Sequence, residues 1–118
     1  MRVASIALIA LLTSTVCALS DDPPTLNVKP VCHGISLQGS DPSEKGGPDL
    51  SFNNCIDSEE QVRNELSKAW STFAPADRGH CVRETTMGGL SSYAELITCL
   101  EMARDVRKLR SELTKGID

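Results

Sequence analysis

Four of the five cysteines lie beyond residue 20, and these four constrain the fold of the chain more than any other feature. An even number of cysteines in a short chain outside the cytoplasm is typical of two disulfides. Small domains use such bonds to supplement a thin hydrophobic core. We therefore predict that the chain is stapled by two disulfides, drawn from Cys32, Cys55, Cys81 and Cys99.

The N-terminus predicts that these cysteines leave the cytoplasm. Arg2 is followed by an apolar run at 3–12 and by small, mildly polar residues at 13–20. This is the pattern of a cleaved secretory signal. The apolar run is shorter than the ~20 residues that a membrane span needs. We expect residues 1–20 to be a signal peptide and the mature protein to be periplasmic or secreted.

The cleavage position and two alternatives stay open. Small residues allow cleavage after Ala18 or after Ser20. The leader would otherwise remain as an uncleaved anchor, or Cys17 would carry a lipid. Val16 is a poor residue before a lipid-modified cysteine, which favours simple cleavage.

Residues 21–54 differ from the rest of the chain in composition. They contain five prolines and four glycines, which interrupt helices and favour turns. We predict an irregular, loop-rich arm with short extended pieces at 26–31 and 35–37. The acidic tract 41–49 has prolines where a calcium loop would place ligands, so we expect a linker there.

Residues 55–118 are predicted to form a helical domain with helices at 58–73, 75–85 and 92–114. Asp57 or Ser58 is expected to cap the first helix, and Pro75 suits the first turn of the second. Ser92 followed by Glu95 forms a capping box for the third. Apolar residues recur at helical spacing in the first helix (Val62, Leu66, Ala69, Trp70, Phe73) and in the third (Tyr93, Leu96, Ile97, Leu100, Ala103, Val106, Leu109, Leu113).

The predicted fold class is therefore all-α: a small, disulfide-stapled three-helix unit with a loop-rich N-terminal arm. The three helices are expected to pack on their shared apolar stripes. Trp70 and Phe73 share the stripe of the first helix, so we expect them in the core rather than on a binding surface.

The heights of the cysteines along the predicted helices distinguish the three possible disulfide connectivities. Cys81 precedes the turn at 88–89 by seven residues, and Cys99 follows it by ten, so both lie at similar heights in a helical hairpin. Cys55 and Cys81 differ by about eleven residues, or ~16 Å, beyond the roughly 7 Å that a disulfide tolerates. This favours the pairs Cys81–Cys99 and Cys32–Cys55, although a tilted second helix would exchange the partners.

One polar cluster is a candidate for catalysis. Asp77, His80 and Glu84 lie on one face of the second helix, where a histidine flanked by carboxylates can act as a general base. The chain has no serine elbow of the G-x-S-x-G type, and Gly79 loosens the backbone beside the histidine. We therefore assign no catalytic residue and favour a non-catalytic role, with activity centred on His80 as the alternative.

No metal or other cofactor is predicted. The dipeptides at 32–33 and 80–81 contain two cysteines and two histidines, which resembles a zinc set. However, adjacent helical residues point about 100° apart, and an oxidising compartment favours disulfides over thiolates.

Charge limits the expected partners. The chain has 16 acidic and 12 basic residues and a net charge of −4, which argues against nucleic acid or an anionic membrane as a partner. We expect no stable membrane insertion after signal cleavage. We therefore expect that a partner, if there is one, is another protein of the cell envelope.

Residues 70–81, 88–89 and 92–104 carry a family resemblance. Over about 55–108 the chain resembles a group of small exported proteins of unknown function from proteobacteria. The resemblance implies a periplasmic setting and no particular activity. It does not extend to 21–54.

Overall fold

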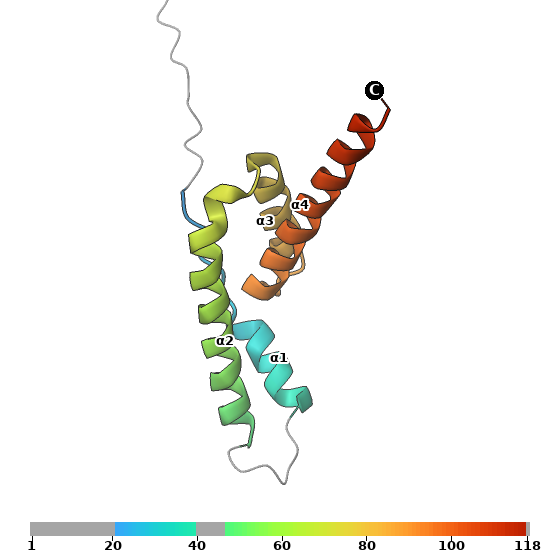
Figure 1. Cartoon of the computed structure of the whole chain (residues 1–118). Helices are drawn as coiled ribbons and strands as arrows, with labels where there is room; N and C mark the ends of the chain where they lie inside the picture. Colours follow the sequence, from blue (N-terminus) through green and yellow to red (C-terminus); the bar gives the residue numbers. More distant parts are fainter. Residues whose placement is uncertain (1–20, 40–46, 118) are drawn as a thin grey trace, which may run out of the picture.

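The computed structural model describes residues 21–39 and 47–117. These residues form only helices and irregular segments, so the all-α prediction is confirmed. The predicted signal peptide at 1–20 lies outside the described residues. The elements, shown in Figure 1, are α1 (Lys29–Gly39), α2 (Gly47–Ala69), the 3₁₀ turn η1 (Trp70–Thr72), α3 (Pro75–Met87) and α4 (Tyr93–Lys115).

The N-terminal arm contains more helix than we predicted. α1 includes 29–31 and 35–37, which were expected to be extended, whereas 26–28 precede the helix. α2 begins at Gly47, inside the predicted linker. The reason is the position of two prolines. Pro30 and Pro48 each occupy the second residue of a helix, where the missing N–H has no intrahelical partner to lose. The predicted boundary at 54/55 consequently falls within α2.

The helix starts predicted farther along the chain had mixed success. Asp57 and Ser58 lie inside α2 and cap nothing at its start, because the helix begins ten residues earlier. Pro75 does open α3, and Ser92 is the N-cap of α4, where its hydroxyl accepts a hydrogen bond from the Glu95 N–H at 3.3 Å.

Two disulfides each staple a pair of helices. Cys32 joins Cys55 between α1 and α2 with a Cα–Cα distance of 5.5 Å. Cys81 joins Cys99 between α3 and α4 at 5.7 Å. These are the two pairs that the heights of the cysteines along the predicted helices favoured. α2 also packs on α4 and so connects the two stapled hairpins.

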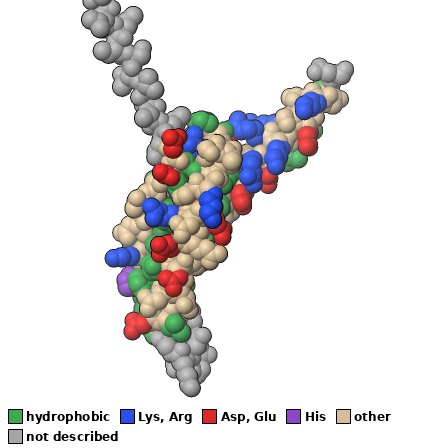
Figure 2. Space-filling view, turned by 60° about the vertical axis from the view of Figure 1, so that its left-hand side comes forward, with side chains coloured by type: hydrophobic (Ala, Val, Ile, Leu, Met, Phe, Trp, Pro, Cys, Tyr) green, Lys and Arg blue, Asp and Glu red, His purple; other side chains and the backbone are tan. Residues whose placement is uncertain are grey.

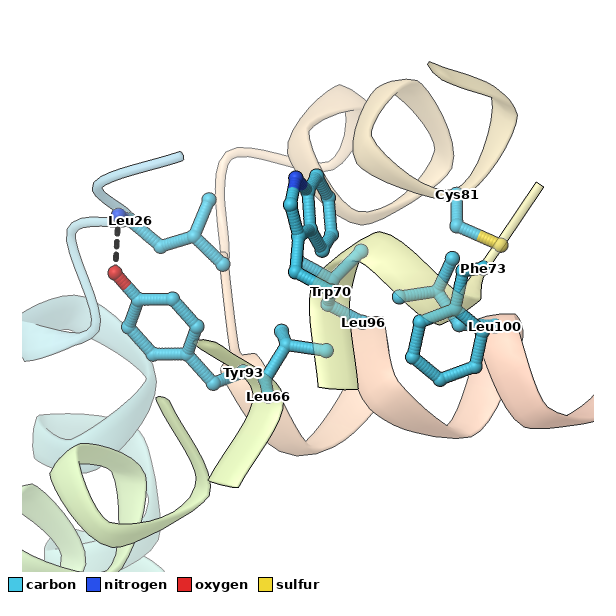
Figure 3. Close-up of a cluster of buried hydrophobic side chains, with 8 residues drawn as sticks. All are labelled: Leu26, Leu66, Trp70, Phe73, Cys81, Tyr93, Leu96 and Leu100. Atoms are coloured by element: carbon cyan, nitrogen blue, oxygen red, sulfur yellow. Dashed lines mark hydrogen bonds between the residues drawn. The ribbon is translucent and has the colours of Figure 1, made fainter. Parts of the chain in front are cut away.

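The core lies where α2, η1, α3 and the first half of α4 meet (Figure 3). Trp70 and Phe73 are buried there, as predicted, at 4% exposure each. Arg78 covers the Trp70 ring and Arg104 covers the Phe73 ring, with charge-to-centroid distances of 5.4 and 5.3 Å. The buried cluster comprises Leu26, Leu66, Trp70, Phe73, Cys81, Tyr93, Leu96 and Leu100.

Tyr93 ties the N-terminal segment to this core. Its hydroxyl accepts a hydrogen bond from the Leu26 N–H at 2.9 Å and donates one to the Pro24 carbonyl at 3.1 Å. Leu26 thereby reaches the core from a segment that has no helix of its own. The segment before α1 is therefore anchored by a residue almost seventy positions away in the sequence.

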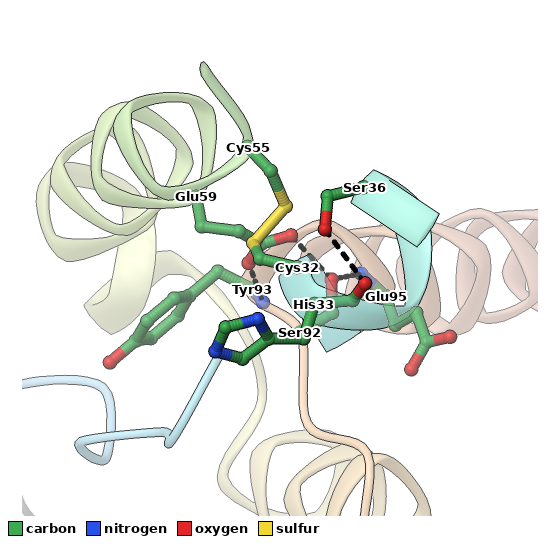
Figure 4. The surroundings of a disulfide bond; sticks show 8 residues. All are labelled: Cys32, His33, Ser36, Cys55, Glu59, Ser92, Tyr93 and Glu95. Atoms are coloured by element: carbon green, nitrogen blue, oxygen red, sulfur yellow. Dashed lines mark hydrogen bonds between the residues drawn. A yellow bond between two sulfur atoms is a disulfide. The ribbon is translucent and has the colours of Figure 1, made fainter. Parts of the chain in front are cut away.

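A buried carboxylate from α2 fixes the start of α4 (Figure 4). Glu59 is 8% exposed. Its two carboxylate oxygens accept hydrogen bonds from the Ser92 hydroxyl at 2.7 Å and from the Tyr93 N–H at 2.6 Å. A negative charge at a helix N-terminus is favoured by the helix dipole and by the unpaired N–H groups there. Glu59 thus sets the position of α4 relative to α2.

The second half of α4 leaves the body of the molecule, contrary to our expectation that the whole stripe is buried. Leu96 and Leu100 are fully buried, but Val106, Leu109 and Leu113 are 49%, 59% and 70% exposed. The short α3 explains the difference, because its N-terminal turn reaches only as far as Arg107 on α4. Beyond that level α4 projects alone among the described elements (Figure 1).

Candidate functional site

A groove lies between α3 and α4. Its volume is about 660 Å³. α3 contributes Asp77, His80 and Glu84, which are the three members of the predicted polar cluster. α4 contributes the opposite wall, formed by Cys99, Met102, Ala103, Val106, Arg107 and Arg110. The structure therefore places the whole polar cluster at one groove.

Asp77 is held by α4. Arg107 donates two hydrogen bonds to its carboxylate, from Nη2 at 2.7 Å and from Nε at 3.2 Å. These hydrogen bonds, and secondly the charge of the carboxylate, raise the pKa of the Arg107 guanidinium above its ordinary value. The guanidinium is therefore charged at every physiological pH. This two-pronged pair links the first turn of α3 to α4.

The geometry gives little support to general-base catalysis. In a catalytic triad of the Ser-His-Asp type a carboxylate orients the histidine base, but both oxygens of Asp77 accept hydrogen bonds from Arg107. The described lining residues include no serine, threonine, tyrosine or lysine, and the cysteine among them is in a disulfide. His80 and Glu84 are exposed at the rim. The arrangement is better suited to contacting a polar partner than to activating a nucleophile.

The two cysteines and two histidines that resemble a zinc set are not brought together. Cys32 and Cys81 are in separate disulfides, on the two different hairpins. His33 stacks on Phe52 of α2 with a centroid distance of 4.3 Å. Within residues 21–39 and 47–117 no group of three His, Cys, Asp or Glu side chains is close enough to hold a metal ion.

A continuous apolar surface extends from the groove to the end of α4. We define the α4 stripe as Met102, Val106, Leu109 and Leu113, which are 66%, 49%, 59% and 70% exposed. The first two line the groove, and the last two lie on the projecting part of the helix. Monomeric proteins rarely leave a contiguous apolar surface of this kind open to water.

Charged side chains flank the α4 stripe on both sides. At 100° per residue, Arg107 and Arg110 lie on the flank next to α3, and Asp105 and Glu112 lie on the other flank. Figure 2 shows basic and acidic side chains along the projecting end of α4. An apolar strip between two charged rims is the usual anatomy of a protein interface.

Sequence reasoning identified Val106, Leu109 and Leu113 as apolar positions of the helix but assigned them to the core, and it did not single out Met102. The signal that could have separated them is the length of the helices, since the predicted second helix is about half as long as the third. A second hollow of about 250 Å³ lies between Pro24, Trp70 and α3. It is below the size of typical small-molecule sites.

Comparison with known proteins finds no matching family model, no matching curated protein and no matching solved structure. Among the described helices, none is both long and apolar enough to cross a membrane. The functional argument therefore depends on the groove and the α4 stripe.

Proposed function

We propose that the protein is an exported, non-catalytic module that binds a helical segment of another polypeptide along α4. The observation that carries this proposal is the exposure of the α4 stripe. Its four apolar side chains recur at spacings of four, three and four residues, which places them on one side of the helix. Amphipathic helices bind in apolar grooves through anchors with this spacing.

The surroundings of the stripe favour a helix over a small ligand. The groove between α3 and α4 continues as an open helix face, so an elongated partner would contact more of it than a compact molecule would. The two disulfides hold both hairpins rigid. A preformed surface loses less conformational freedom on binding, which favours association.

The compartment is part of the proposal. Two disulfides are typical of chains that fold outside the cytoplasm, and the pattern of residues 1–20 is that of an export signal. The resemblance to small exported proteobacterial proteins suggests the periplasm in particular. Mass spectrometry of protein recovered from the periplasm tests this. We expect an N-terminus after Ala18 or Ser20 and no free thiol, and a retained leader would contradict export by cleavage.

Site-specific photo-crosslinking in the periplasm tests the binding surface. A photoreactive amino acid replaces Leu109 on the stripe, and the control replaces Ser111, which points about 160° away from Leu109 on the same helix. We expect a discrete adduct from position 109 that disappears when Val106→Glu is added, and no adduct from position 111. Equal labelling from both positions, or none from either, would contradict a specific docking surface.

A second candidate is activity centred on His80. It is supported by the placement of Asp77, His80 and Glu84 on one groove. His80→Ala tests it without disturbing the core, because His80 is exposed. If gene deletion has a phenotype that H80A reproduces while the crosslink from position 109 persists, the catalytic candidate is favoured over the binding module.

A further inference from the structure

The α4 stripe has the pattern of a short coiled-coil seam. Taking Val106 and Leu113 as positions a of a heptad places Met102 and Leu109 at positions d. A β-branched residue at a together with leucine at d favours two-stranded parallel coils. Val106 and Leu109 have this combination, and Met102 and Leu113 continue the seam as apolar residues.

The charges beside the stripe specify which helix that is. Asp105 and Glu112 occupy positions g, and Arg110 occupies position e. In a parallel pair of identical helices, position g of one chain faces position e of the next heptad on the other. Asp105 would then face Arg110 of the second helix, and the symmetry of the pair would repeat this contact.

The antiparallel alternative is disfavoured by the same residues. Antiparallel helices bring g beside g and e beside e, so in the register that pairs Val106 with Leu109, Asp105 would face Glu112 and Arg110 would face Ala103. Like charges at such positions destabilise pairing. The flanks of α4 are thus complementary to a second copy of α4 only in the parallel direction.

The body of the molecule leaves this face accessible. Leu109 follows Leu100 by nine residues, which is a rotation of about 180° around the helix axis. Leu100 is fully buried against the body, whereas Leu109 is exposed on the opposite side. A second helix can therefore approach from the side away from α2, along the part of α4 that projects in Figure 1.

We propose that α4 of a second copy of this chain occupies the α4 stripe in parallel, forming a short two-stranded coiled coil with reciprocal Asp105–Arg110 pairs. This inference rests on the proposed function, since it names the partner helix. The seam from 102 to 113 is only about 17 Å long, so the interface is smaller than a standard complex and its dimer is weak. The helix is already folded on a stapled body, which removes the cost of forming it on association.

Sedimentation equilibrium of the mature, oxidised protein up to about 1 mM tests the dimer. We expect a concentration-dependent monomer–dimer equilibrium that Leu109→Glu abolishes with an unchanged circular dichroism spectrum. D105R should weaken dimerisation by about three- to tenfold, since each of two contacts contributes a few-fold. The charge swap D105R/R110D should restore it. The control K108D alters a position away from the seam and should leave it unchanged.

The direction of the D105R effect separates the two orientations. In an antiparallel pair, D105R would place an arginine beside Glu112 and strengthen the dimer, which would overturn the proposal. A protein that stays monomeric at every concentration would also overturn it. The proposed function is tested separately by the mass of the crosslink from position 109. An adduct of twice the chain mass supports a second copy, an adduct of any other mass overturns this inference but keeps the docking surface, and the absence of an adduct contradicts both.

Discussion

Replacing Glu59 by alanine should destabilise the fold more than any other substitution of an acidic side chain among the described residues. This carboxylate is buried between α2 and α4 and accepts two short hydrogen bonds, from Ser92 and Tyr93. Ser92 and Tyr93 are themselves only 4% and 3% exposed. In Glu59→Ala neither donor would have water to replace the lost acceptor.

The magnitude follows from these contacts. A hydrogen bond to a charged group contributes about 1.5–3 kcal/mol, and leaving a buried donor unpaired costs about 1–3 kcal/mol. Removing the carboxylate also removes its own desolvation cost, which offsets part of the loss. We expect Glu59→Ala to lower the free energy of unfolding by about 2–4 kcal/mol. Glu59→Gln can retain both hydrogen bonds, because the Ser92 hydroxyl can accept from the new amide. It should cost only the charge–dipole contribution of about 0.3–2 kcal/mol.

Urea unfolding followed by circular dichroism, with the disulfides intact, measures both changes. Glu60→Ala is the matched control, because Glu60 is exposed on the same helix and such substitutions stay within about 0.5 kcal/mol. Amide exchange at the first turn of α4 should accelerate in the alanine variant. If Glu59→Ala is no more destabilising than Glu60→Ala, the carboxylate does not cap α4 and the reasoning is wrong.

Two further perturbations test what holds the helices in place. Tyr93→Phe removes both hydrogen bonds that anchor the N-terminal segment, so it should cost about 1–3 kcal/mol and expose residues 21–28 to limited proteolysis. A proteolysis pattern like that of the wild type would contradict the anchoring role. Replacing Cys81 and Cys99 together by alanine should lower the free energy of unfolding by about 3 kcal/mol and loosen α3 from α4, as measured by amide exchange in α3. Unchanged exchange in α3 would show that packing alone holds the hairpin.

The sequence was most informative where one local interaction decides the structure. Ser92 and Pro75 mark the starts of α4 and α3 because a cap and a first-turn proline act within a few residues. The cysteine pairs could be predicted from the sequence for a related reason. Distances along a helix are fixed at 1.5 Å per residue, so the levels of Cys81 and Cys99 could be compared before the fold was known.

The N-terminal arm was predicted poorly because proline content was taken as evidence against helix. Pro30 and Pro48 are compatible with helix because each is the second residue of its helix. The amino-acid composition of a segment does not say where in a helix its prolines lie. This error also affected the interpretation of Glu59, farther along the chain. A helix beginning near 58, as predicted, would place Glu59 in the first turn of its own helix. In the structure it belongs to the middle of α2 and acts on the start of α4.

The polar cluster shows a different limit. Helical spacing correctly placed Asp77, His80 and Glu84 on one face of α3, and the structure brings all three to one groove. What spacing could not reveal is that Arg107, thirty residues away, takes both oxygens of Asp77. A contact between separate helices depends on how they pack, which periodicity within one helix does not specify.

The exposure of the α4 stripe and the anchoring of the first half of α4 can be explained together. Periodicity reports which side of a helix is apolar, but it does not report whether the chain itself covers that side. Here α3 is too short to cover α4. The disulfide Cys81–Cys99 joins the two helices at the middle of α3, and the Asp77–Arg107 pair joins them at its first turn. The remaining apolar positions keep helical geometry because the first half of α4 is anchored by the core and by Glu59. A chain that needed only stability could end near Arg107, since the residues beyond it are exposed. Truncation after 107 should therefore leave the free energy of unfolding within about 1 kcal/mol while abolishing dimerisation, and a large loss of stability would show that the projecting helix belongs to the core.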